Sequence, residues 1–223
     1  PATGRHPLPD PERLRVLFSS FGIGPETRVV AYDDGPGAIA ARLWWLLRWM
    51  GHRHAALLDG GLAAWRAAGL PLATDAPAPV PGRSFTGQPG AMPTRDTAKL
   101  AAALASGDGR LRLLDARAPD RFAGTTEPID PVAGHVPGAI NAPFTGNLGS
   151  DGRFLSPGEL AARFAALAGN RSPADVVCMC GSGVTACHNL FALELAGLSG
   201  AALYPGSWSE WIRSPDRPVA KGP

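Results

Sequence analysis

The three cysteines of this chain lie within ten residues of one another. Cys178, Cys180 and Cys187 fall in the stretch VVCMCGSGVTACHNLFALELAG, which covers residues 176–197. A short apolar strand there runs into a glycine-rich turn, and the turn opens a helix near Val184. The backbone amides of such a turn converge beside a helix N-terminus, where they stabilise an anion such as a thiolate. Cys180 stands at that point and is therefore the candidate nucleophile.

The other two thiols allow more than one interpretation. Cys178 lies two residues back on the same strand and faces the same side, and Cys187 lies on the first turns of the helix. With His188 they could form a metal site, but a Cys-x-Cys inside a strand does not bring three or four ligands together. Small buried apolar side chains are the favoured interpretation of both. No metal and no cofactor are expected.

Two classes of enzyme are suggested by a cysteine on a strand–loop–helix turn. Cysteine phosphatases clamp the phosphoryl group with an arginine six residues after the cysteine, and here that position is Ala186. No Lys or Arg occurs from Cys180 to Leu195, so phosphate chemistry lacks its clamp. A cysteine hydrolase would need a general base nearby, and nothing in the local sequence requires one.

The cysteine-bearing stretch has a counterpart earlier in the chain. VVAYDDGPGAIAARLWWLLRWMG, residues 29–51, has the same order of apolar strand, glycine-bearing turn and helix closed by glycine. The likeness continues, because AALLDGGLAAW (55–65) matches AALYPGSWSEW (201–211) at a constant offset of 146 residues. This offset and the shared Trp65 and Trp211 favour an internal duplication over a chance likeness between two βα units.

The duplication and the composition together predict two domains. Residues 1–72 form the first domain, the Pro- and Gly-rich residues 73–93 a linker along the surface, and residues 94–223 the second domain. Strands alternate with helices, so the fold class is α/β in both domains, with mostly parallel sheets flanked by helices. In the second domain we expect helices over 97–105 and 156–168 and from about 184, and strands over 110–116 and 175–179, near 140 and near 201–204.

The first domain is expected to be incomplete at its N-terminus. At the same offset, the counterpart of residue 94 would stand about fifty residues before Pro1. The first copy therefore lacks partners for the strand in LRLLDAR and for the stretch GHVPGAIN. A parallel sheet without these strands would expose an unpaired edge and an apolar face. We expect that preceding residues, or another chain, supply them.

Composition excludes several classes of function. The net charge is +2 and the Lys and Arg residues are scattered, which does not fit a nucleic-acid-binding surface. No apolar stretch approaches 18 residues, since LWWLLRWM is interrupted at Arg48, so no membrane association is expected. Three clustered cysteines do not make a secreted disulfide framework and favour reduced thiols in a cytoplasm.

Five motifs taken in order resemble one known family. CGSGVTAC, LLDARAPDRFAG, GHVPGAINAPF, LLDGGLAAW and PGSWSEW cover nearly the whole chain and look like tandem-domain rhodaneses, the thiosulfate and 3-mercaptopyruvate sulfurtransferases. GRHPLP and EPIDPVAGHVPGAI are similar to actinobacterial members in particular. The resemblance implies two rhodanese domains, of which only the second carries a cysteine. Because Asp33 stands opposite Cys180, the first domain is expected to be catalytically silent.

The resemblance also implies a persulfide mechanism. Cys180 would take the outer sulfur of a donor, hold it as a persulfide and pass it to a nucleophilic acceptor. The amides of a six-residue loop would cradle this sulfur; the loop consists of Cys180, Gly181, Ser182, Gly183, Val184 and Thr185.

Further roles are implied by matches to single family positions. In mercaptopyruvate enzymes the loop serine belongs to a Ser-His-Asp relay, and Ser182 and His6 match its first two members, with the aspartate expected before residue 1. Arg121 matches an arginine that binds the carboxylate of the donor. A second arginine is expected nine residues later, where this chain has Asp130, which should turn away or weaken the pocket. His135 is expected to fix a turn.

The identity of the donor stays open between 3-mercaptopyruvate and thiosulfate. The loop carries no basic residue, which favours 3-mercaptopyruvate because thiosulfate is a dianion, whereas Asp130 would repel a carboxylate. The acceptor could be a small thiol, cyanide or thioredoxin, and the sequence does not choose among them. The alternative to an enzyme is a non-catalytic rhodanese-like module that carries or binds sulfur.

Overall fold

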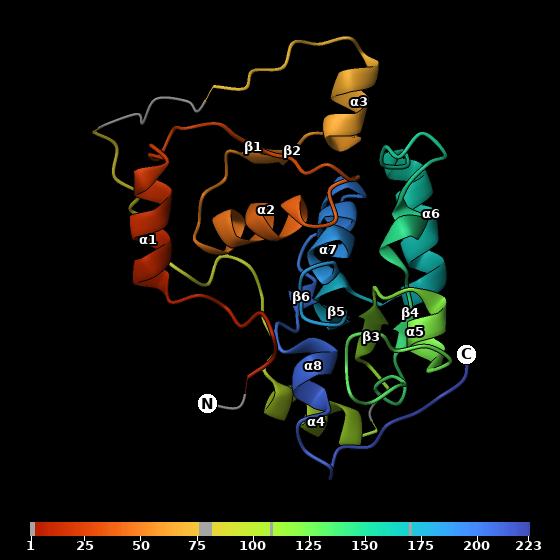
Figure 1. Cartoon of the computed structure of the whole chain (residues 1–223). Coiled ribbons are helices and arrows are strands. Elements are labelled where there is room, and N and C mark those ends of the chain that lie inside the picture. Colours follow the sequence, from red (N-terminus) through yellow and green to blue (C-terminus); the bar gives the residue numbers. More distant parts are fainter. Residues whose placement is uncertain (1–2, 76–81, 108, 170) are drawn as a thin grey trace.

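The structure is a computed structural model that describes residues 3–75, 82–107, 109–169 and 171–223. Two parallel sheets organise it, one of two strands and one of four strands in the order β4-β3-β5-β6 (Figure 1). The strands are β1 (Val29–Ala31), β2 (Ala55–Leu57), β3 (Arg112–Asp115), β4 (Ile140–Asn141), β5 (Val176–Met179) and β6 (Ala202–Leu203). The α-helices are α1 (Pro11–Ser20), α2 (Ala40–Trp49), α3 (Gly61–Ala67), α4 (Thr97–Ala105), α5 (Pro119–Ala123), α6 (Pro157–Ala168), α7 (Ala186–Leu195) and α8 (Ser207–Trp211). The predicted α/β class with parallel sheets flanked by helices is confirmed.

Local sequence signals account for most element boundaries. α4 has the predicted bounds 97–105 and begins where the Asp96 side chain accepts a hydrogen bond from the Lys99 amide. α6 begins one residue later than predicted, because Ser156 and Glu159 form a reciprocal capping box ahead of it. β3 is shorter than the predicted strand 110–116, because its pairing with β5 covers only Arg112 to Asp115. All three predicted segments are therefore present; α4 matches its predicted bounds, and α6 and β3 are shorter than predicted.

The four-stranded sheet buries both of its faces. Along β5, Val176 and Cys178 belong to the apolar core shared with α6 and α7, while Val177 and Met179 belong to a second core under α4 and α8. All four residues are buried, which explains why this strand reads as an unbroken apolar run instead of an alternating one. Helices on both sides therefore hold the end of β5, and with it Cys180, in place.

The two halves repeat one another in detail. Gly37 and Gly183 both have a positive φ, of 90° and 80°, and stand 146 residues apart in the turns before α2 and α7. At the start of α3 and of α8, Gly61 has φ 58° and its counterpart Ser207 has φ 52°. A side chain rarely adopts such a φ, so a shared left-handed residue at both positions supports the inferred duplication. We call the half with β1 and β2 the N-terminal unit and the half with β3–β6 the C-terminal unit.

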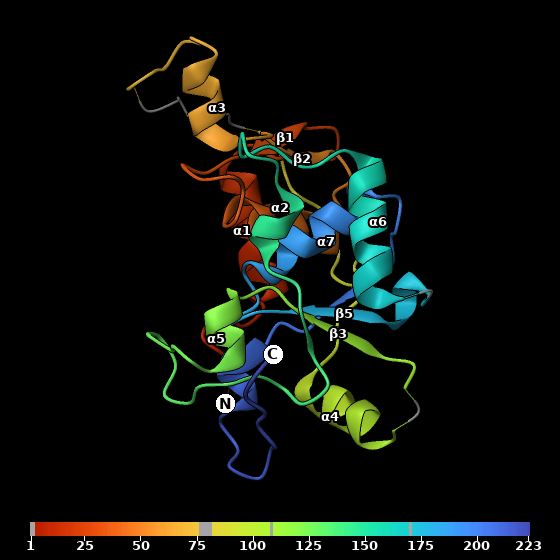
Figure 2. The ribbon, with the colours of Figure 1, turned by 90° about the vertical axis from the view of Figure 1, so that its right-hand side faces the viewer.

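Helices α2 and α7 lie side by side where the two units meet (Figures 1 and 2). Nη1 of Arg42, on α2, donates to the carbonyl of Gly183 at 3.0 Å. His188, which stands 146 residues after Arg42 on α7, pairs through Nε2 with the carbonyl of Pro36 at 3.2 Å. Each unit thus sends one buried hydrogen-bonding side chain to a carbonyl in the loop of the other. The pairing is reciprocal and ties the two loops together.

The linker lies against the N-terminal unit in the part that the structure describes. Within the predicted linker 73–93, residues 76–81 lie outside the described residues. The ring of Phe85 is buried against Phe18 of α1, with ring centroids 5.0 Å apart, and Met92 is also buried. The predicted surface path is therefore anchored by apolar side chains, which the Pro- and Gly-rich composition did not indicate.

The two-stranded sheet corresponds to only part of the larger one. β1 and β2 match β5 and β6, and the described residues contain no counterparts of β3 and β4 beside β1. Val30 on β1 is 56% exposed and the following Tyr32 is 59% exposed. This agrees with the missing partners inferred from the sequence; the expectation that preceding residues or another chain supply them stays a prediction. No helix in the described ranges is long and apolar enough to cross a membrane.

The contact between the units predicts a pH-dependent stability. Nδ1 of His188 accepts from Asn147, so Nε2 carries the proton given to Pro36 and the ring is neutral. Burial lowers the pKa of His188 to about 4, against the opposing effects of the Pro36 carbonyl and of Asp33. Because the unfolded chain binds this proton more readily, stability is full above the ordinary pKa of 6.5 and falls as the pH drops towards 4.

Thermal unfolding between pH 7 and pH 4 measures this dependence. We expect a loss on the order of 3 kcal/mol from this group. His188→Gln keeps a donor and an acceptor, so it should flatten the curve, whereas His54→Gln, at an exposed position, should leave it as in the parent chain. Equal slopes for the parent chain and His188→Gln would contradict the assignment.

Candidate active site

A cavity of about 270 Å³ opens at the C-terminal end of β5, over the loop that follows this strand. Cys180 lines it together with four residues of the predicted cradle, which are Gly181, Ser182, Val184 and Thr185. The cysteine is only 2% exposed overall, so this cavity is its route to a small molecule. Ligand sites of parallel sheets lie at this end of the strands.

The loop backbone is shaped around the cysteine sulfur. The amide of Gly183 donates to Sγ of Cys180 at 3.1 Å, which closes the turn. Gly183 has φ 80°, and a side-chain carbon added there would lie 2.6 Å from the Pro205 carbonyl oxygen. The position therefore requires glycine, both for its backbone angle and for its space. Gly183 therefore belongs to the predicted cradle, and its backbone amide points at the sulfur of Cys180.

Helix α8 fixes the start of the loop from outside. The amide of Cys180 donates to Oγ of Ser207 at 3.1 Å, and that hydroxyl donates to the Tyr204 carbonyl at 2.9 Å. The amides of Trp208 and Ser209 in turn donate to the carbonyls of Cys180 and Gly181. Every hydrogen bond here is made by buried groups, so Cys180 has little freedom to move relative to α8.

Ser182 and His6 meet as the resemblance implied. Oγ of Ser182 lies 2.8 Å from Nδ1 of His6, although 176 residues separate them. The segment that carries His6 is pinned to α8, because the amides of Gly4 and Arg5 donate to side-chain oxygens of Glu210 and Ser209. Arg42 adds a hydrogen bond from Nη2 to the His6 carbonyl at 3.2 Å. The N-terminal unit thus delivers a histidine to the loop of the C-terminal unit.

Arg121 reaches the cavity from α5, with its guanidinium held from behind by carboxylates. Nη2 of Arg121 donates to Glu127 at 2.7 Å and to Asp130 at 3.2 Å. Burial raises the pKa of Glu127, but hydrogen bonds from Arg121 and from two backbone amides outweigh burial and leave the pKa below its usual value. The carboxylate therefore stays charged at neutral pH and fixes the guanidinium.

Asp130 does not line the cavity, which agrees with the expectation that it turns away from the pocket. Its carboxylate is 3% exposed and ion-paired with Arg121 and also with Arg5. The guanidiniums of Arg5 and Arg121, unlike this carboxylate, line the cavity beside the cysteine loop. Asp130 bridges two arginines instead of repelling a ligand. Arg5 lies beside His6 in the GRHPLP motif, but its role could not be predicted from the sequence because its partner is 125 residues away.

The other two cysteines lack access to the cavity. Cys178 and Cys187 are fully buried, and burial raises the pKa of both thiols, that of Cys187 to about 12 and that of Cys178 higher still. Sγ of Cys187 donates to the Gly183 carbonyl at 3.4 Å. Both thiols are therefore protonated at neutral pH and pack as small apolar groups.

The loop of the N-terminal unit contains its own anion. Asp33, opposite Cys180, accepts hydrogen bonds from the amides of Gly37, Ile39 and Ala40 at 2.8–2.9 Å. Burial raises the pKa of this carboxyl, but these amide hydrogen bonds outweigh it and keep the pKa low. A carboxylate thus occupies the cradle that holds sulfur in the C-terminal unit, and a nucleophile is missing there.

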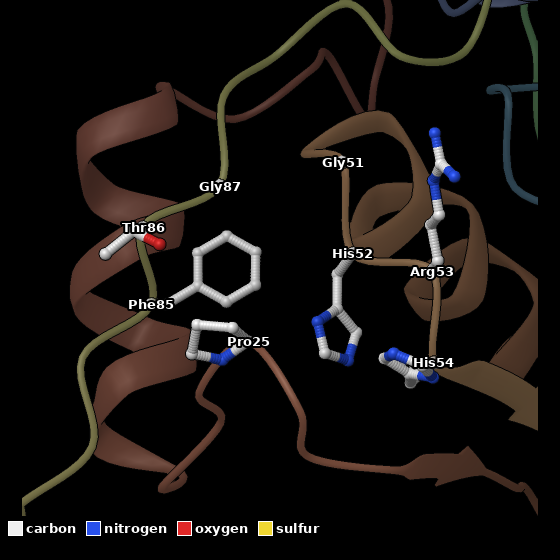
Figure 3. A pocket seen from close by; sticks show the side chains of 8 residues that line it. All are labelled: Pro25, Gly51, His52, Arg53, His54, Phe85, Thr86 and Gly87. Carbon is white, nitrogen blue, oxygen red and sulfur yellow. The ribbon is translucent and has the colours of Figure 1, made fainter.

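A second cavity, of about 210 Å³, lies at the linker and is lined by no cysteine (Figure 3). Figure 3 shows the rings of Pro25, His52 and Phe85 along it. Nε2 of His52 pairs with the Thr27 carbonyl at 2.8 Å, so its role is structural. His135 behaves similarly in the C-terminal unit, because Nδ1 pairs with the Phe122 carbonyl at 2.8 Å and the two rings stack. The turn-fixing role expected for His135 agrees with these contacts.

Comparison with known proteins identifies the family. The model of the rhodanese-like domain matches residues 2–68 and 96–214, one segment in each unit. The chain belongs to the rhodanese family. The tandem rhodanese arrangement predicted from the motifs is thereby confirmed.

Its relatives are rhodaneses with a shared activity. The probable 3-mercaptopyruvate sulfurtransferase of Pseudomonas aeruginosa is 59% identical over 99% of this chain and 77% of its own length. The putative thiosulfate sulfurtransferase SseB of Mycobacterium tuberculosis is 43% identical over 98% of this chain and 76% of its own length. Among solved structures, the 3-mercaptopyruvate sulfurtransferase from Leishmania major is 32% identical with a TM-score of 0.78, over 96% of this chain and 60% of that one. This rhodanese is a sulfurtransferase, which decides against a non-catalytic module.

The burial of the three thiols predicts that only one of them reacts. Cys180→Ser should abolish sulfur transfer, measured as thiocyanate formed from thiosulfate and cyanide. Cys178→Ser and Cys187→Ser should keep most of the activity, although each places a hydroxyl in an apolar core and costs about 1–3 kcal/mol of stability. Mass spectrometry after donor treatment should find the added sulfur on Cys180. An adduct on Cys187 instead would refute the assignment.

Proposed function

We propose that this rhodanese transfers sulfur from 3-mercaptopyruvate through a persulfide on Cys180. The observation that carries the proposal is the pairing of His6 with Ser182, which lines the same cavity as Cys180 and Arg121. The thiolate of Cys180 attacks the donor sulfur, an S–S bond forms and the C–S bond breaks. The electron pair of that bond leaves on carbon as the enolate of pyruvate, which must gain a proton. The products are pyruvate and the Cys180 persulfide.

The need for that proton explains the Ser182–His6 pair. The proton lost by the Cys180 thiol can pass through the serine hydroxyl and the imidazole to the leaving enolate, so no net charge accumulates. Thiosulfate needs no such transfer, because sulfite leaves as a stable dianion. A hydroxyl–imidazole pair 2.8 Å apart next to the nucleophile therefore favours a donor with a carbon leaving group. Thiosulfate is the second candidate donor, supported by the name of the 43% identical relative.

The remaining residues have two roles, which are to hold the sulfur of the persulfide and to bind the carboxylate of the donor. The amides of Gly181, Gly183, Val184 and Thr185 would hold the charged sulfur of the persulfide, as amides hold an oxyanion in acyl transfer. Arg121 would bind the carboxylate of the donor through charge-assisted hydrogen bonds. The persulfide then passes its outer sulfur to a small thiol, cyanide or thioredoxin, and the Cys180 thiolate is restored.

We also propose a division of the chain that follows from these roles. Residues 94–223 carry the nucleophile and the cradle, residues 1–72 are catalytically silent but supply His6, and residues 73–93 link them. The three cysteines are unpaired, and persulfide chemistry needs reduced thiols, so a cytoplasmic location suits the activity.

Because only 3-mercaptopyruvate needs a proton on its leaving group, variants of the Ser182–His6 pair should affect the two donors differently. Ser182→Ala and His6→Gln should lower kcat/KM with 3-mercaptopyruvate by about a hundredfold, since positioned acid–base groups contribute at least that much. With thiosulfate the same variants should lose little. Pyruvate release and thiocyanate formation report the two reactions, and Ser106→Ala, at the exposed end of α4, is the matched control. Equal losses with both donors would contradict the relay.

Binding of the donor by Arg121 predicts that its removal lowers kcat/KM with both donors. Arg121→Ala removes a charge-assisted hydrogen bond to the anionic end of the donor, which is worth about 1.5–3 kcal/mol. The kcat/KM should therefore fall on the order of tenfold to a hundredfold for 3-mercaptopyruvate. The loss should appear mainly in KM, because the clamp binds a group that does not react. Unchanged kinetics with both donors would show that Arg121 does not bind the donor.

A further inference from the structure

We propose that Arg42, on α2 of the N-terminal unit, is a positioning residue for sulfur transfer in the C-terminal unit. Its guanidinium holds two backbone segments of the site at once, the peptide that joins Gly183 to Val184 and the backbone of His6. It thereby fixes the amide cradle and the imidazole relative to each other. The inference deepens the proposed function and rests on it for the part that concerns His6.

The two acceptors of Arg42 lie next to the reacting groups. Nη1 donates to the Gly183 carbonyl at 3.0 Å, and Nη2 donates to the His6 carbonyl at 3.2 Å. The amide of Gly183 itself donates to Sγ of Cys180 at 3.1 Å. Nδ1 of His6 lies 2.8 Å from Oγ of Ser182. Arg42 does not line the donor cavity, but it binds the backbone of the two residues that contact Cys180 and Ser182.

The charge of Arg42 is buried without a carboxylate partner. The residue is 9% exposed, and no ion pair within the described ranges of the chain involves it. Arg117, buried in the C-terminal unit, is instead paired with Asp115 and Glu127. Arg42 contacts two carbonyls, and its Cζ lies 5.7 Å from the ring centroid of Trp45. Packing alone does not account for an arginine here, because an apolar side chain would fill the space without the desolvation of a charge.

The Gly183 carbonyl determines where the next amide of the cradle points. The peptide bond to Val184 is trans, and a trans peptide directs its C=O and its N–H to opposite sides. Arg42 holds the carbonyl oxygen, and Sγ of Cys187 donates to the same oxygen at 3.4 Å. The amide of Val184 therefore points away from Arg42, and Val184 lines the cavity of Cys180. A cation on the carbonyl also makes that amide a stronger donor, because successive hydrogen bonds polarise one another.

The His6 carbonyl ties the segment that carries the imidazole to the N-terminal unit. The amides of Gly4 and Arg5 hold this segment on α8, but both of these contacts precede His6 in the chain. Arg42 holds the segment at His6 itself. Without this hydrogen bond the backbone of His6 can rotate about the contacts with α8, and such a rotation moves the ring relative to Ser182. Arg42 therefore sets the distance between imidazole and hydroxyl.

Arg42→Lys tests the proposal, because lysine keeps the charge but lacks the planar fork that holds two acceptors in fixed directions. Single-turnover rates at saturating donor are measured as pyruvate release from 3-mercaptopyruvate and as sulfite release from thiosulfate. Since a displacement of about 1 Å can slow a reaction on the order of a hundredfold, we expect a loss of about that size with 3-mercaptopyruvate. The half-saturating donor concentration should change less than about threefold, because Arg42 does not line the donor cavity.

Thiosulfate separates the two parts of this loss. It needs the cradle but not the Ser182–His6 pair, so Arg42→Lys should lower its rate only about tenfold. In the Ser182→Ala background, where the pair is already broken, Arg42→Lys should likewise lower the rate with 3-mercaptopyruvate only about tenfold further. Arg48→Lys is the matched control and should keep the parent rates. Arg48 lies on the same helix but pairs with Glu194 at 4.0 Å, at the end of α7 that is remote from the loop.

Several outcomes would overturn the proposal. An unchanged rate in a folded Arg42→Lys variant would show that the two carbonyls need no guanidinium. A higher half-saturating concentration with an unchanged rate would make Arg42 a residue of the donor pocket. A further loss of about a hundredfold in the Ser182→Ala background would show a general loosening of the structure, because independent losses multiply and coupled ones do not.

Arg42→Gln, which is shorter and neutral, is measured in parallel and should show the same pattern. Circular dichroism and thermal unfolding check that each variant is folded. If neither variant folds, Arg42 serves stability instead of positioning, and the proposal is overturned.

The result can be separated from the proposed donor. If the parent chain releases sulfite from thiosulfate but no pyruvate from 3-mercaptopyruvate, the proposed donor is rejected, and a loss of about tenfold in Arg42→Lys with thiosulfate still supports the role of Arg42. If the parent chain releases pyruvate and Arg42→Lys does so at the same rate, the donor stands and the role of Arg42 is rejected.

Discussion

The loop around Cys180 depends on one contact, in which the backbone amide of Gly183 points at the cysteine sulfur. A tight turn does this only if one residue takes a positive φ, and Gly183 meets that requirement against the Pro205 carbonyl. Such a turn exposes its own carbonyls, and these need partners of their own. The Gly183 carbonyl is bound by Arg42, and those of Cys180 and Gly181 by α8. The surrounding helices therefore serve the loop as much as they serve the core.

The same constraint explains why the active site draws on both units. The loop lies at the carboxyl end of β5, where it faces the neighbouring unit across α2 and α7. Arg42 reaches the loop from α2, and His6 and Arg5 reach it from the segment before α1. A long side chain can span this contact only if both units are held rigidly. Arg42 and His188 provide part of that rigidity through their reciprocal hydrogen bonds.

Local signals in the sequence predicted the fold better than the charges of the site. Caps at Asp96 and Ser156 and the apolar run of β5 act over a few residues, so the bounds of α4 and α6 could be read directly. The pairing of Ser182 with His6 followed only from resemblance. The ion pair of Asp130 with Arg5 could not be predicted, because the two residues are far apart in the chain. An ion pair between distant segments leaves no periodic trace in a sequence, whereas a strand or a capped helix does.

Asp33 shows what became of the duplicated copy. The amides of its loop still converge, but a fixed carboxylate satisfies them permanently, so this loop keeps its shape with no bound sulfur. The N-terminal unit nevertheless contributes to the Cys180 loop, through Arg42 and through the arm that carries His6. The two loops are also tied to each other directly, since His188 at the start of α7 pairs with the Pro36 carbonyl, so substitutions in one loop should constrain those tolerated in the other.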